Sequence, residues 1–363
     1  MKKQILEFEQ VEGRSIDARR MFNARILGLV GLEGGKKLGQ GLEKCVYDSD
    51  KNLDCNKPLP RLPSTQVNVV LSADAYQEEK EAKQKIMAVL DPSVVDRIFI
   101  TLDDQPTCEH MRLPPKCTSE ARKAVQIVLA RSEKGSTSKK FESKEAFGYA
   151  VVNLVFGLWA LHSHNLIHGD VKIEPRANNA VRVGKVYKLI DLGMVMTFDH
   201  IKKGIEDRHS SQAQELWNMR KYVYWSVGHL YAVLHLKDVK ETCTKFNISW
   251  DRVLHLYFEN IDLVGFMRSV SILVHLNPNL DLKPLLTQLQ ATPQDFSNEH
   301  ELNARKLVWS SAKATLDSLD VGNRTSRHGQ EMFLDLPRMY QRIRAYCALD
   351  LPKTIQEYGM KPM

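Results

Sequence analysis

The feature that most constrains the fold of this chain is a change of sequence pattern near residue 132. Before that point, short β-branched runs alternate with loops that contain Gly, Pro and Asp, a pattern typical of strands. After it, most of the chain has the apolar spacing of helices. The pattern therefore predicts an α+β protein, with a small strand-rich part at residues 1–131 and a larger, mainly helical part at residues 132–363.

The strand-rich part is expected to contain one helix among its strands. That helix covers residues 75–90, which lack Gly and Pro and are rich in Glu, Lys, Gln and Ala. Asp91 and Pro92 after it are a helix-stop signal. A polar linker, residues 132–138, leads into the helical part. Short apolar runs predict strands at residues 25–30, 45–47, 66–71, 97–102 and 124–130.

The helical part opens with a long helix at residues 142–164, whose apolar residues are too numerous for a one-sided stripe. We expect it to be a central core helix. Residues 180–183 and 186–190 flank Gly184 and Lys185, a two-residue turn with Gly where a positive φ is favoured, and so predict a β-hairpin. Helical spacing recurs at residues 251–263, 302–319 and 336–349, which are expected to complete the core.

Composition and charge bear on several classes of protein. With 363 residues, of which 43% are hydrophobic, the chain is long enough to bury a sizeable core. The uncharged stretches at residues 150–167 and 222–235 are interrupted by polar residues or are shorter than the ~20 apolar residues of a membrane span, so no membrane partner is expected. The net charge of +7 is spread along the chain, and its densest basic group, residues 134–144, lies among Ser, Thr and Glu. We therefore expect no specific nucleic-acid partner.

The cysteines and the first residues bear on the compartment. The six cysteines include no Cys-x-x-Cys pair and no Cys/His group at zinc-ligand spacing. The sequence opens without the charged, apolar and small-residue pattern of a signal peptide. These observations favour free thiols in a reducing compartment, the cytoplasm.

Two acidic motifs lie on either side of the predicted hairpin. The sequence HGDVK at residues 168–172 follows the long helix, and DLG at residues 191–193 follows the hairpin. Asp170 and Asp191 are thus expected at the ends of rigid elements rather than on long loops. Phosphoryl transfer needs such a set, with carboxylates for Mg²⁺, donors for the phosphates and a base beside the acceptor hydroxyl.

In their order and in the hairpin between them, these motifs resemble the catalytic loop, His-x-Asp-x-Lys-x-x-Asn, and the metal-binding turn, Asp-Phe-Gly, of the protein-kinase superfamily. The resemblance covers about residues 25–240 and implies a two-lobed protein-kinase-like fold that binds ATP with Mg²⁺ or Mn²⁺. It implies that Asp170 orients the acceptor hydroxyl or accepts its proton, that Lys172 steadies the γ-phosphate, and that Asp191 holds the metal ion. His168 would be a structural brace.

Residues 38–47, LGQGLEKCVY, occupy the place of the family's glycine-rich loop. By this resemblance Gly39 and Gly41 let backbone N–H groups approach the phosphate oxygens, and Val46 completes the motif. An alternative register uses the earlier glycines, Gly31, Gly34 and Gly35.

The lysine that binds phosphates in most of the family is missing from its expected strand, residues 67–72, while Lys44 replaces the third glycine of the loop. The with-no-lysine kinases carry their phosphate-binding lysine at this loop position. The resemblance therefore implies that Lys44 contacts the α- and β-phosphates; the alternative is a lysine directed to solvent.

A helix glutamate orients this lysine in the family, and Glu78, Glu79 and Glu81 all qualify. Glu79 is favoured because it shares a helical face with apolar residues, the alternative being an exposed charge.

The family's asparagine, its second metal ligand, is also displaced. Pro175 stands where it is expected, and an insertion at residues 173–177 would move it to Asn178 or Asn179. Asn179 is favoured because an apolar strand follows at once. The alternative is that both asparagines only form a turn.

Other departures concern regulation and substrate docking. Gly169 replaces the arginine that clamps a phosphorylated activation segment in many kinases, so switching by that route is not expected. Val223 stands where an aspartate of the family anchors the backbone of the catalytic loop, and the Ala-Pro-Glu motif is missing. These losses affect substrate docking more than nucleotide binding.

Among the activities of the family, Lys172 favours phosphoryl transfer to Ser or Thr hydroxyls of protein substrates, as in the Ser/Thr branch. The rival is a pseudokinase, a binding scaffold without transfer, which the missing lysine and the shifted asparagine motivate. A small-molecule kinase is the third hypothesis. The divergent pattern also resembles the protein kinases of large DNA viruses, for which the location would be the host-cell cytoplasm or the virion.

Overall fold

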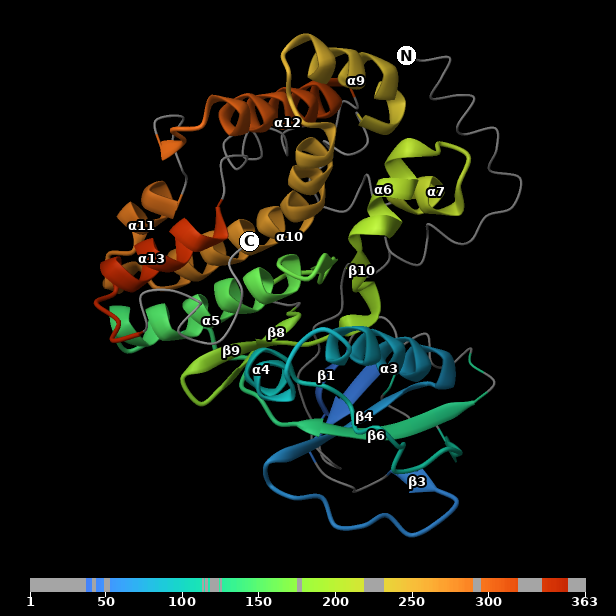
Figure 1. The fold of residues 1–363 in the computed structure, drawn as a ribbon. Coiled ribbons are helices and arrows are strands. Elements are labelled where there is room, and N and C mark those ends of the chain that lie inside the picture. The colour runs from blue at the N-terminus through green and yellow to red at the C-terminus, as the bar shows by residue number, and fades with distance from the viewer. Residues whose placement is uncertain are drawn as a thin grey trace. The chain divides into compact units, whose positions relative to one another are not determined.

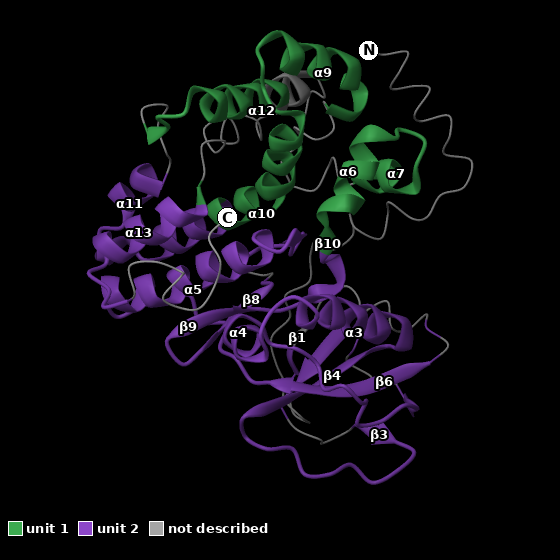
Figure 2. Cartoon of the chain, viewed as in Figure 1, with its two compact units in different colours: residues 1–26, 196–267, 290–335 green, residues 27–195, 268–289, 336–363 purple. Residues whose placement is uncertain are grey.

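The structure, a computed structural model, describes residues 37–40, 44–48, 53–112, 114, 117, 124, 126–174, 178–218, 232–289, 295–318 and 335–351. These residues form a mixed protein with a small strand-rich region and a helical part, which agrees with the α+β class expected from the sequence (Figure 1). Contacts group the chain into two compact units (Figure 2). The helical unit comprises residues 1–26, 196–267 and 290–335, and the mixed unit comprises residues 27–195, 268–289 and 336–363.

The elements follow one another from strands to helices along the chain. The strands are β1 Lys37–Gln40, β2 Lys44–Tyr47, β3 Asp54–Cys55, β4 Gln66–Ser72, β5 Met111–Arg112, β6 Ile127–Glu133, β7 Leu166–Ile167, β8 Ala180–Val183, β9 Val186–Leu189 and β10 Met196–Thr197. The α-helices are α3 Ala73–Met87, α4 Pro92–Ile98, α5 Lys144–His162, α6 Phe198–Glu206, α7 Ser211–Asn218, α9 Leu236–Lys245, α10 Trp250–Leu276, α11 Lys283–Leu289, α12 Glu299–Ser318 and α13 Leu336–Tyr346. Two short 3₁₀ turns are η2 Leu192–Met194 and η4 Pro278–Leu280.

In the mixed unit, four antiparallel strands form a sheet in the order β1-β2-β4-β6. Side chains of successive strand residues point to opposite faces of the sheet. Val46 on β2 and Val69 on β4 pack with helix α3 on one face, whereas Cys45 and Val70 belong to a second cluster on the other. The sheet therefore lies between two hydrophobic layers.

Helix α3 follows β4 without a loop. The Ser72 hydroxyl caps its first turn by accepting a hydrogen bond from the Ala75 N–H (3.1 Å). The Tyr76 hydroxyl donates to the Asp103 carbonyl oxygen (2.7 Å), which ties the helix to the segment after α4. The buried residues recur every three or four positions and form one face: Ala75, Tyr76, Glu79, Ala82 and Ile86. The helix predicted at residues 75–90 is thus confirmed, with an earlier end at Met87.

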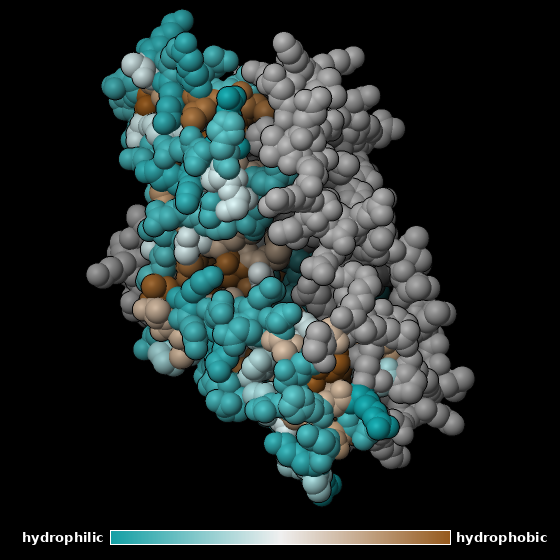
Figure 3. Space-filling model, turned by 90° about the vertical axis from the view of Figure 1, so that its right-hand side faces the viewer, coloured by the Kyte–Doolittle hydropathy of each residue, from teal (hydrophilic) through white to brown (hydrophobic). Residues whose placement is uncertain are grey.

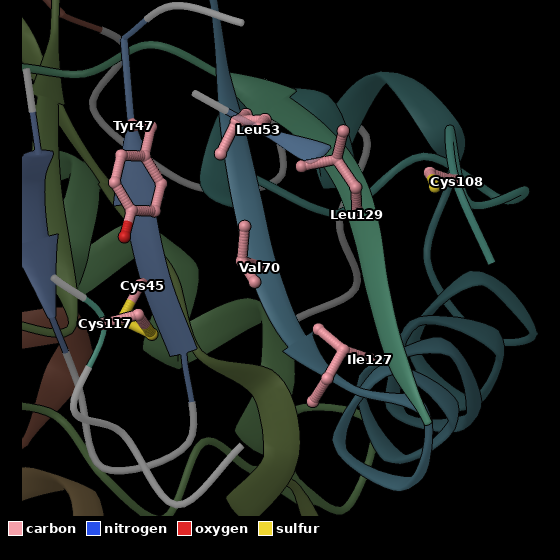
Figure 4. Close-up of a cluster of buried hydrophobic side chains, with 8 residues drawn as sticks. All are labelled: Cys45, Tyr47, Leu53, Val70, Cys108, Cys117, Ile127 and Leu129. Carbon is pink, nitrogen blue, oxygen red and sulfur yellow. A yellow bond between two sulfur atoms is a disulfide. The ribbon is translucent and has the colours of Figure 1, made fainter. Parts of the chain in front are cut away.

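The other face of the sheet is covered by segments that two disulfides hold, Cys45–Cys117 and Cys55–Cys108. Figure 4 shows this cluster, with Cys45 of β2 joined to Cys117. The expectation of free thiols is therefore wrong for these four cysteines. The bonded residues are 72 and 53 positions apart in the chain, so only the fold brings them together and their spacing does not reveal them.

The disulfides also bear on the compartment. Such bonds persist in oxidising surroundings and are rare in the cytosol, so they weaken the argument for a reducing compartment. The cytoplasmic location stays a prediction. The remaining cysteines, Cys243 and Cys347, are free and buried.

Helix α5 forms the core of the mixed unit and is buried almost throughout, which confirms the predicted core helix. Asn153 in its middle donates to the carbonyl oxygens of Arg97 (3.1 Å) and Tyr187 (2.8 Å), so it links α4 to β9. A methyl group on Gly157 would lie 2.3 Å from the Ile98 side chain, which shows that α4 packs directly on α5. The strand-rich region and the hairpin β8–β9 are thus both attached to this helix.

Among the described residues, α5 is the one helix long and apolar enough to cross a membrane. Buried core helices meet the same criterion, and 83% of its most apolar window is buried, so this is weak evidence for a span. On the face in Figure 3, hydrophilic residues cover most of the described surface. The large hydrophobic residues exposed in the described ranges are Leu38, Met87, Val89 and Phe246.

In the helical unit, an ion-pair network joins α10 to α12. Arg252 of α10 donates to both carboxylate oxygens of Glu301 (2.8 and 2.9 Å). Arg305, one turn farther along α12, donates to the same carboxylate (2.6 Å). The buried hydroxyl oxygens of Tyr257 and Ser311 lie 2.7 Å apart and form a second polar link between the two helices.

The strand expected at residues 97–102 is wrong. Helix α4 occupies its first residues, and only isolated bridges at Phe99 and Leu102 follow. Asp91 explains the difference, because its carboxylate caps α4 by accepting a hydrogen bond from the Ser93 N–H (2.8 Å). The Asp-Pro pair that follows α3 therefore also starts the next helix.

The remaining predicted elements agree in type where the structure describes them. The strand expected at residues 124–130 is observed as β6, so the boundary drawn at residue 132 falls inside this strand, and the division into two parts there stays a prediction. The hairpin is present as β8 and β9, and Gly184 in its turn has a φ of +58°. Residues 25–30 and 222–231 lie outside the described residues.

The double variant Cys55→Ser with Cys108→Ser is expected to lose about 2–4 kcal/mol of unfolding free energy under oxidising conditions. The reason is that this bond restricts an unfolded chain across a separation of 53 residues. Urea unfolding of the wild type and the variant, each with and without a reducing agent, measures the effect.

Cys243→Ala, which removes a buried free thiol, is the control and should respond to the reducing agent as the wild type does. A wild-type unfolding free energy that is the same with and without the reducing agent would contradict a structural role for the disulfides.

Candidate functional site

The first acidic motif follows β7 and lies against the second. Gly169 has a φ of +77°, a conformation that favours glycine, and a methyl group there would lie 2.4 Å from the Met194 carbonyl oxygen. The His168 ring joins the two segments. Its Nδ1 accepts a hydrogen bond from the Asp170 N–H (3.3 Å), and its Nε2 donates to the Ile190 carbonyl oxygen (3.1 Å). His168 therefore makes the bracing contact expected from the sequence.

Asp170 is the buried carboxylate of the first motif, with 8% of the residue exposed. Its Oδ2 accepts hydrogen bonds from Lys172 Nζ (2.6 Å) and from Asn179 Nδ2 (2.5 Å). Its Oδ1 is also buried and has no hydrogen-bond partner among the described residues. An orphaned carboxylate oxygen of this kind can accept a hydrogen bond from a hydroxyl group or bind a metal ion.

The surroundings of Asp170 raise its pKa above the ordinary value of an aspartate. Burial, together with the nearby charge of Asp191, raises the pKa of Asp170 to about 7, against the opposing effects of Lys172 and Asn179. A carboxyl group with this pKa exchanges its proton near neutral pH, as a general base must.

The structure separates the two candidate asparagines. Asn178 pairs with Ile173 across the base of the insertion, and its Oδ1 accepts a hydrogen bond from the Glu174 N–H (3.1 Å). Asn179 instead donates to the Asp170 carbonyl oxygen (3.1 Å) as well as to its carboxylate. Asn179 therefore lies against the first acid, whereas Asn178 closes the loop.

Lys44 reaches the site from β2. It pairs with Leu71 of β4, and its side chain leaves the strand on the face that α3 covers. Its Nζ donates to the Glu79 carboxylate and to Asp191 Oδ1 (3.0 Å). The Lys44 side chain is only 18% exposed, so the alternative of a lysine directed to solvent is wrong.

Glu79 is buried on the inner face of α3, whereas Glu78 and Glu81 are exposed. Its carboxylate accepts hydrogen bonds from Lys44 Nζ and from the Leu192 N–H. Burial raises the pKa of Glu79, and the Lys44 charge opposes that rise. Of the three glutamates that the sequence allowed, Glu79 is the one that contacts Lys44, because helical spacing turns it toward the sheet.

Asp191 lies in the turn between β9 and η2, with a φ of +67°. Residues other than glycine adopt this left-handed conformation rarely, and such positions cluster at functional sites. Burial acts to raise the pKa of Asp191, but the charge and hydrogen bond of Lys44 outweigh it and lower the pKa to about 2. The side chain is 37% exposed, so this ionised carboxylate is accessible to a cation.

The oxygen atoms of this site suit a magnesium ion. Asp191 has a carboxylate and Asn179 has an amide oxygen, which are ligand types that Mg²⁺ prefers. In the described part of the chain, no group of three or more His, Cys, Asp or Glu side chains is arranged to hold a metal ion. Mg²⁺ is commonly bound by one or two carboxylates together with substrate phosphates, and the residues present fit that mode.

The expected glycine-rich loop is described in part. Gly39 lies on β1 and pairs with Val46 of β2, and Val46 packs beside the cluster under α3. Gly41 lies outside the described residues. The glycines of the alternative register also lie outside them: Gly31, Gly34 and Gly35.

Comparison with known proteins does not assign this chain to a family. No protein-family model matches the chain, and no curated protein matches it. The relationship to protein kinases therefore stays a prediction that rests on the two acidic motifs and the residues around them.

Two contributions to the site are not apparent from the sequence. Gly169 stands where many kinases have an arginine, and its positive φ and close approach to the Met194 carbonyl oxygen require glycine. Ser269 on α10 accepts a hydrogen bond from the Ile173 N–H (2.9 Å) and so reaches the segment of the first acidic motif from far along the chain. A single serine inside a helix gives no local signal of such a contact.

Gly169→Ala is expected to lower the free energy of unfolding by about 2–5 kcal/mol, because it adds a left-handed strain and a clash with the Met194 carbonyl oxygen. Gly184→Ala is the matched control. Its φ is also positive, but nothing lies within 4 Å of the added methyl group, so only about 1–2 kcal/mol should be lost. Denaturant unfolding of the two variants measures both losses, and equal losses would argue against the close approach of the two loops.

Proposed function

We propose that the chain is a protein-kinase-like phosphotransferase that uses ATP with Mg²⁺ or Mn²⁺ to phosphorylate Ser or Thr hydroxyls of protein substrates. One observation carries this proposal. Lys44, Glu79 and Asp191 come from three separate segments and converge in one ion-pair cluster. The resemblance to kinases assigned these residues to a single nucleotide site, and their contact supports that assignment.

In this proposal, each member of the cluster has a distinct task. Lys44 binds phosphate oxygens of ATP, and Glu79 keeps the Lys44 ammonium group directed into the site. Asp191 and Asn179 would hold the metal ion, with Gly39 and Gly41 in the loop above the phosphates. The metal ion, when bound, neutralises negative charge on the phosphates during transfer.

Asp170 is the proposed base. Lys172 and Asn179 occupy its Oδ2 and fix the direction of the carboxylate, which leaves Oδ1 for the acceptor hydroxyl. With a pKa of about 7, a substantial fraction of Asp170 is ionised at neutral pH and can take the hydroxyl proton. Lys172 places a positive charge beside this carboxylate, where the transferred phosphoryl group would be negative.

The same contacts favour an enzyme over a scaffold. Burying a carboxylate without full pairing costs stability, and Asp170 retains one buried oxygen for which the described residues provide no partner. A binding scaffold has no chemical need for that arrangement, whereas transfer to a hydroxyl does. The two alternatives, a pseudokinase and a small-molecule kinase, would each give a distinct result in the assay described next.

The proposal is tested with purified protein, labelled ATP, Mg²⁺ or Mn²⁺ and a generic protein acceptor. We expect label on Ser and Thr residues, and we expect Asp170→Asn and Asp191→Ala each to reduce its incorporation at least about 100-fold. Incorporation that survives both substitutions would rule out the assigned site. Nucleotide binding without transfer would identify a scaffold, and label only in small acceptors would identify a small-molecule kinase.

Lys44→Met in the same assay isolates the task of the lysine. We expect kcat/KM for ATP to fall about 10- to 100-fold, since a hydrogen bond to a charged group contributes about 1.5–3 kcal/mol. Lys85→Met removes an exposed positive charge from α3 and is the matched control, with no change expected.

The pH dependence of kcat/KM should follow Asp170. Activity is expected to fall as the pH is lowered through about 7, because a protonated Asp170 cannot accept the hydroxyl proton. Lys172→Met should move the midpoint of this fall to higher pH, since the Lys172 charge helps to hold the pKa of Asp170 down. Profiles of both proteins check this, and a midpoint that is unchanged or lower in the variant would count against Asp170 as the base.

A further inference from the structure

The segment that carries Asp170 and Lys172 has no regular secondary structure of its own. Between β7 and residue 174, its only pairing of the strand type is an isolated bridge from Ile173 to Asn178. The position of this backbone therefore depends on single hydrogen bonds rather than on a helix or a sheet ladder.

One peptide group of this loop, between Lys172 and Ile173, is held at both of its polar atoms. The Lys172 carbonyl oxygen accepts a hydrogen bond from the Asn179 N–H (2.8 Å), and the Ile173 N–H donates to the Ser269 hydroxyl oxygen (2.9 Å). Because a peptide group is planar, fixing both atoms fixes its plane. This sets the direction in which the Lys172 side chain leaves the backbone toward Asp170, which it contacts at 2.6 Å.

Helix α10 holds the next loop residue as well. Arg268, the neighbour of Ser269, donates from its Nη2 to the Glu174 carboxylate (3.2 Å). Ser269 and Ile173 are both fully buried, with 0% and 1% exposed. Successive residues of the helix thus contact successive residues of the loop, and the Ser269 contact lies where water is excluded.

Burial makes the Ser269 contact consequential. An N–H group that loses its acceptor in a buried place costs the free energy of its desolvation, so the Ile173 N–H must find another partner. In the absence of the hydroxyl, the peptide group has to rotate or the loop has to move. Either change alters the position of Lys172 relative to Asp170.

We propose that Ser269 is a positioning residue for Lys172 and Asp170, a role that rests on the proposed phosphotransferase function. It provides, from α10, a hydrogen-bond acceptor for the catalytic loop. Val223, which stands at the place of the family's anchoring aspartate, has no side-chain acceptor and lies outside the described ranges.

Ser269→Ala is expected to lower kcat about tenfold, equivalent to about 1.4 kcal/mol of transition-state stabilisation, with KM for ATP changed less than about twofold. KM is spared because Lys44, Glu79 and Asp191 make no contact with this peptide group in the described structure. Ser269→Thr retains a hydroxyl and should recover most of the lost kcat. A residue that only stabilised the fold would not separate kcat from KM in this way.

Ser311→Ala is the matched control, because Ser311 is another buried helix serine whose hydroxyl is hydrogen-bonded, to Tyr257 in the helical unit. Its kcat should equal that of the wild type. A kcat for Ser269→Ala within about twofold of the wild type would overturn the proposal.

Amide hydrogen exchange tests the same contact without any activity. The Ile173 amide is expected to exchange at least about tenfold faster in Ser269→Ala than in the wild type, while amides of α5 keep their rates. If the wild type transfers no phosphate, the proposed function fails; faster exchange at Ile173 then still supports the anchoring of the loop. Unchanged exchange at Ile173 overturns the anchoring, whether or not the protein is active.

Discussion

The arrangement of the candidate site depends on one positive charge, the ammonium group of Lys44. Two carboxylates meet there, Glu79 from α3 and Asp191 from the turn after β9. Without that charge, the buried Glu79 would lie near the partly exposed Asp191, and desolvation and mutual repulsion would both disfavour ionisation of Glu79. The ion pairs of Lys44 thus join β2 to α3 and to the left-handed turn at Asp191.

From Lys44, positive and negative side chains alternate toward the first acidic motif. Lys172 contacts Asp170 and also lowers the pKa of Asp191, so it acts on both acids. The two acids end with different properties: burial dominates at Asp170, whose pKa is about 7, and Lys44 dominates at Asp191, whose pKa is about 2. One carboxylate can exchange a proton at neutral pH and the other stays ionised, which is the division of tasks that acid–base chemistry beside a metal ion requires.

Sequence patterns predicted those parts of the site that local periodicity encodes. The long helix and the hairpin were readable from apolar spacing, and helical spacing alone selected Glu79 from three glutamates. The choice of Lys44 came from a resemblance, and its contact with Asp191 depends on strand register that no local pattern fixes. Contacts between distant segments were not predictable: both disulfides and the bond from Ser269 to Ile173 join residues whose spacing carries no signal. The sequence indicates that a helix ends before Asp91, but it does not show that another begins there, because one Asp-Pro pair serves both α3 and α4.

The bond between Cys45 and Cys117 has a consequence for the charge on the far side of the sheet. Cys45 directly follows Lys44 on β2, so their side chains leave opposite faces of the strand. A slip of β2 by one residue against β4 would exchange those faces and carry the lysine into the apolar layer. The disulfide opposes that slip, because it holds the Cys45 side chain beside Cys117, on the face of the sheet opposite α3. This disulfide, which lies among hydrophobic residues, thereby helps to fix the strand register that presents Lys44 to Glu79 and Asp191.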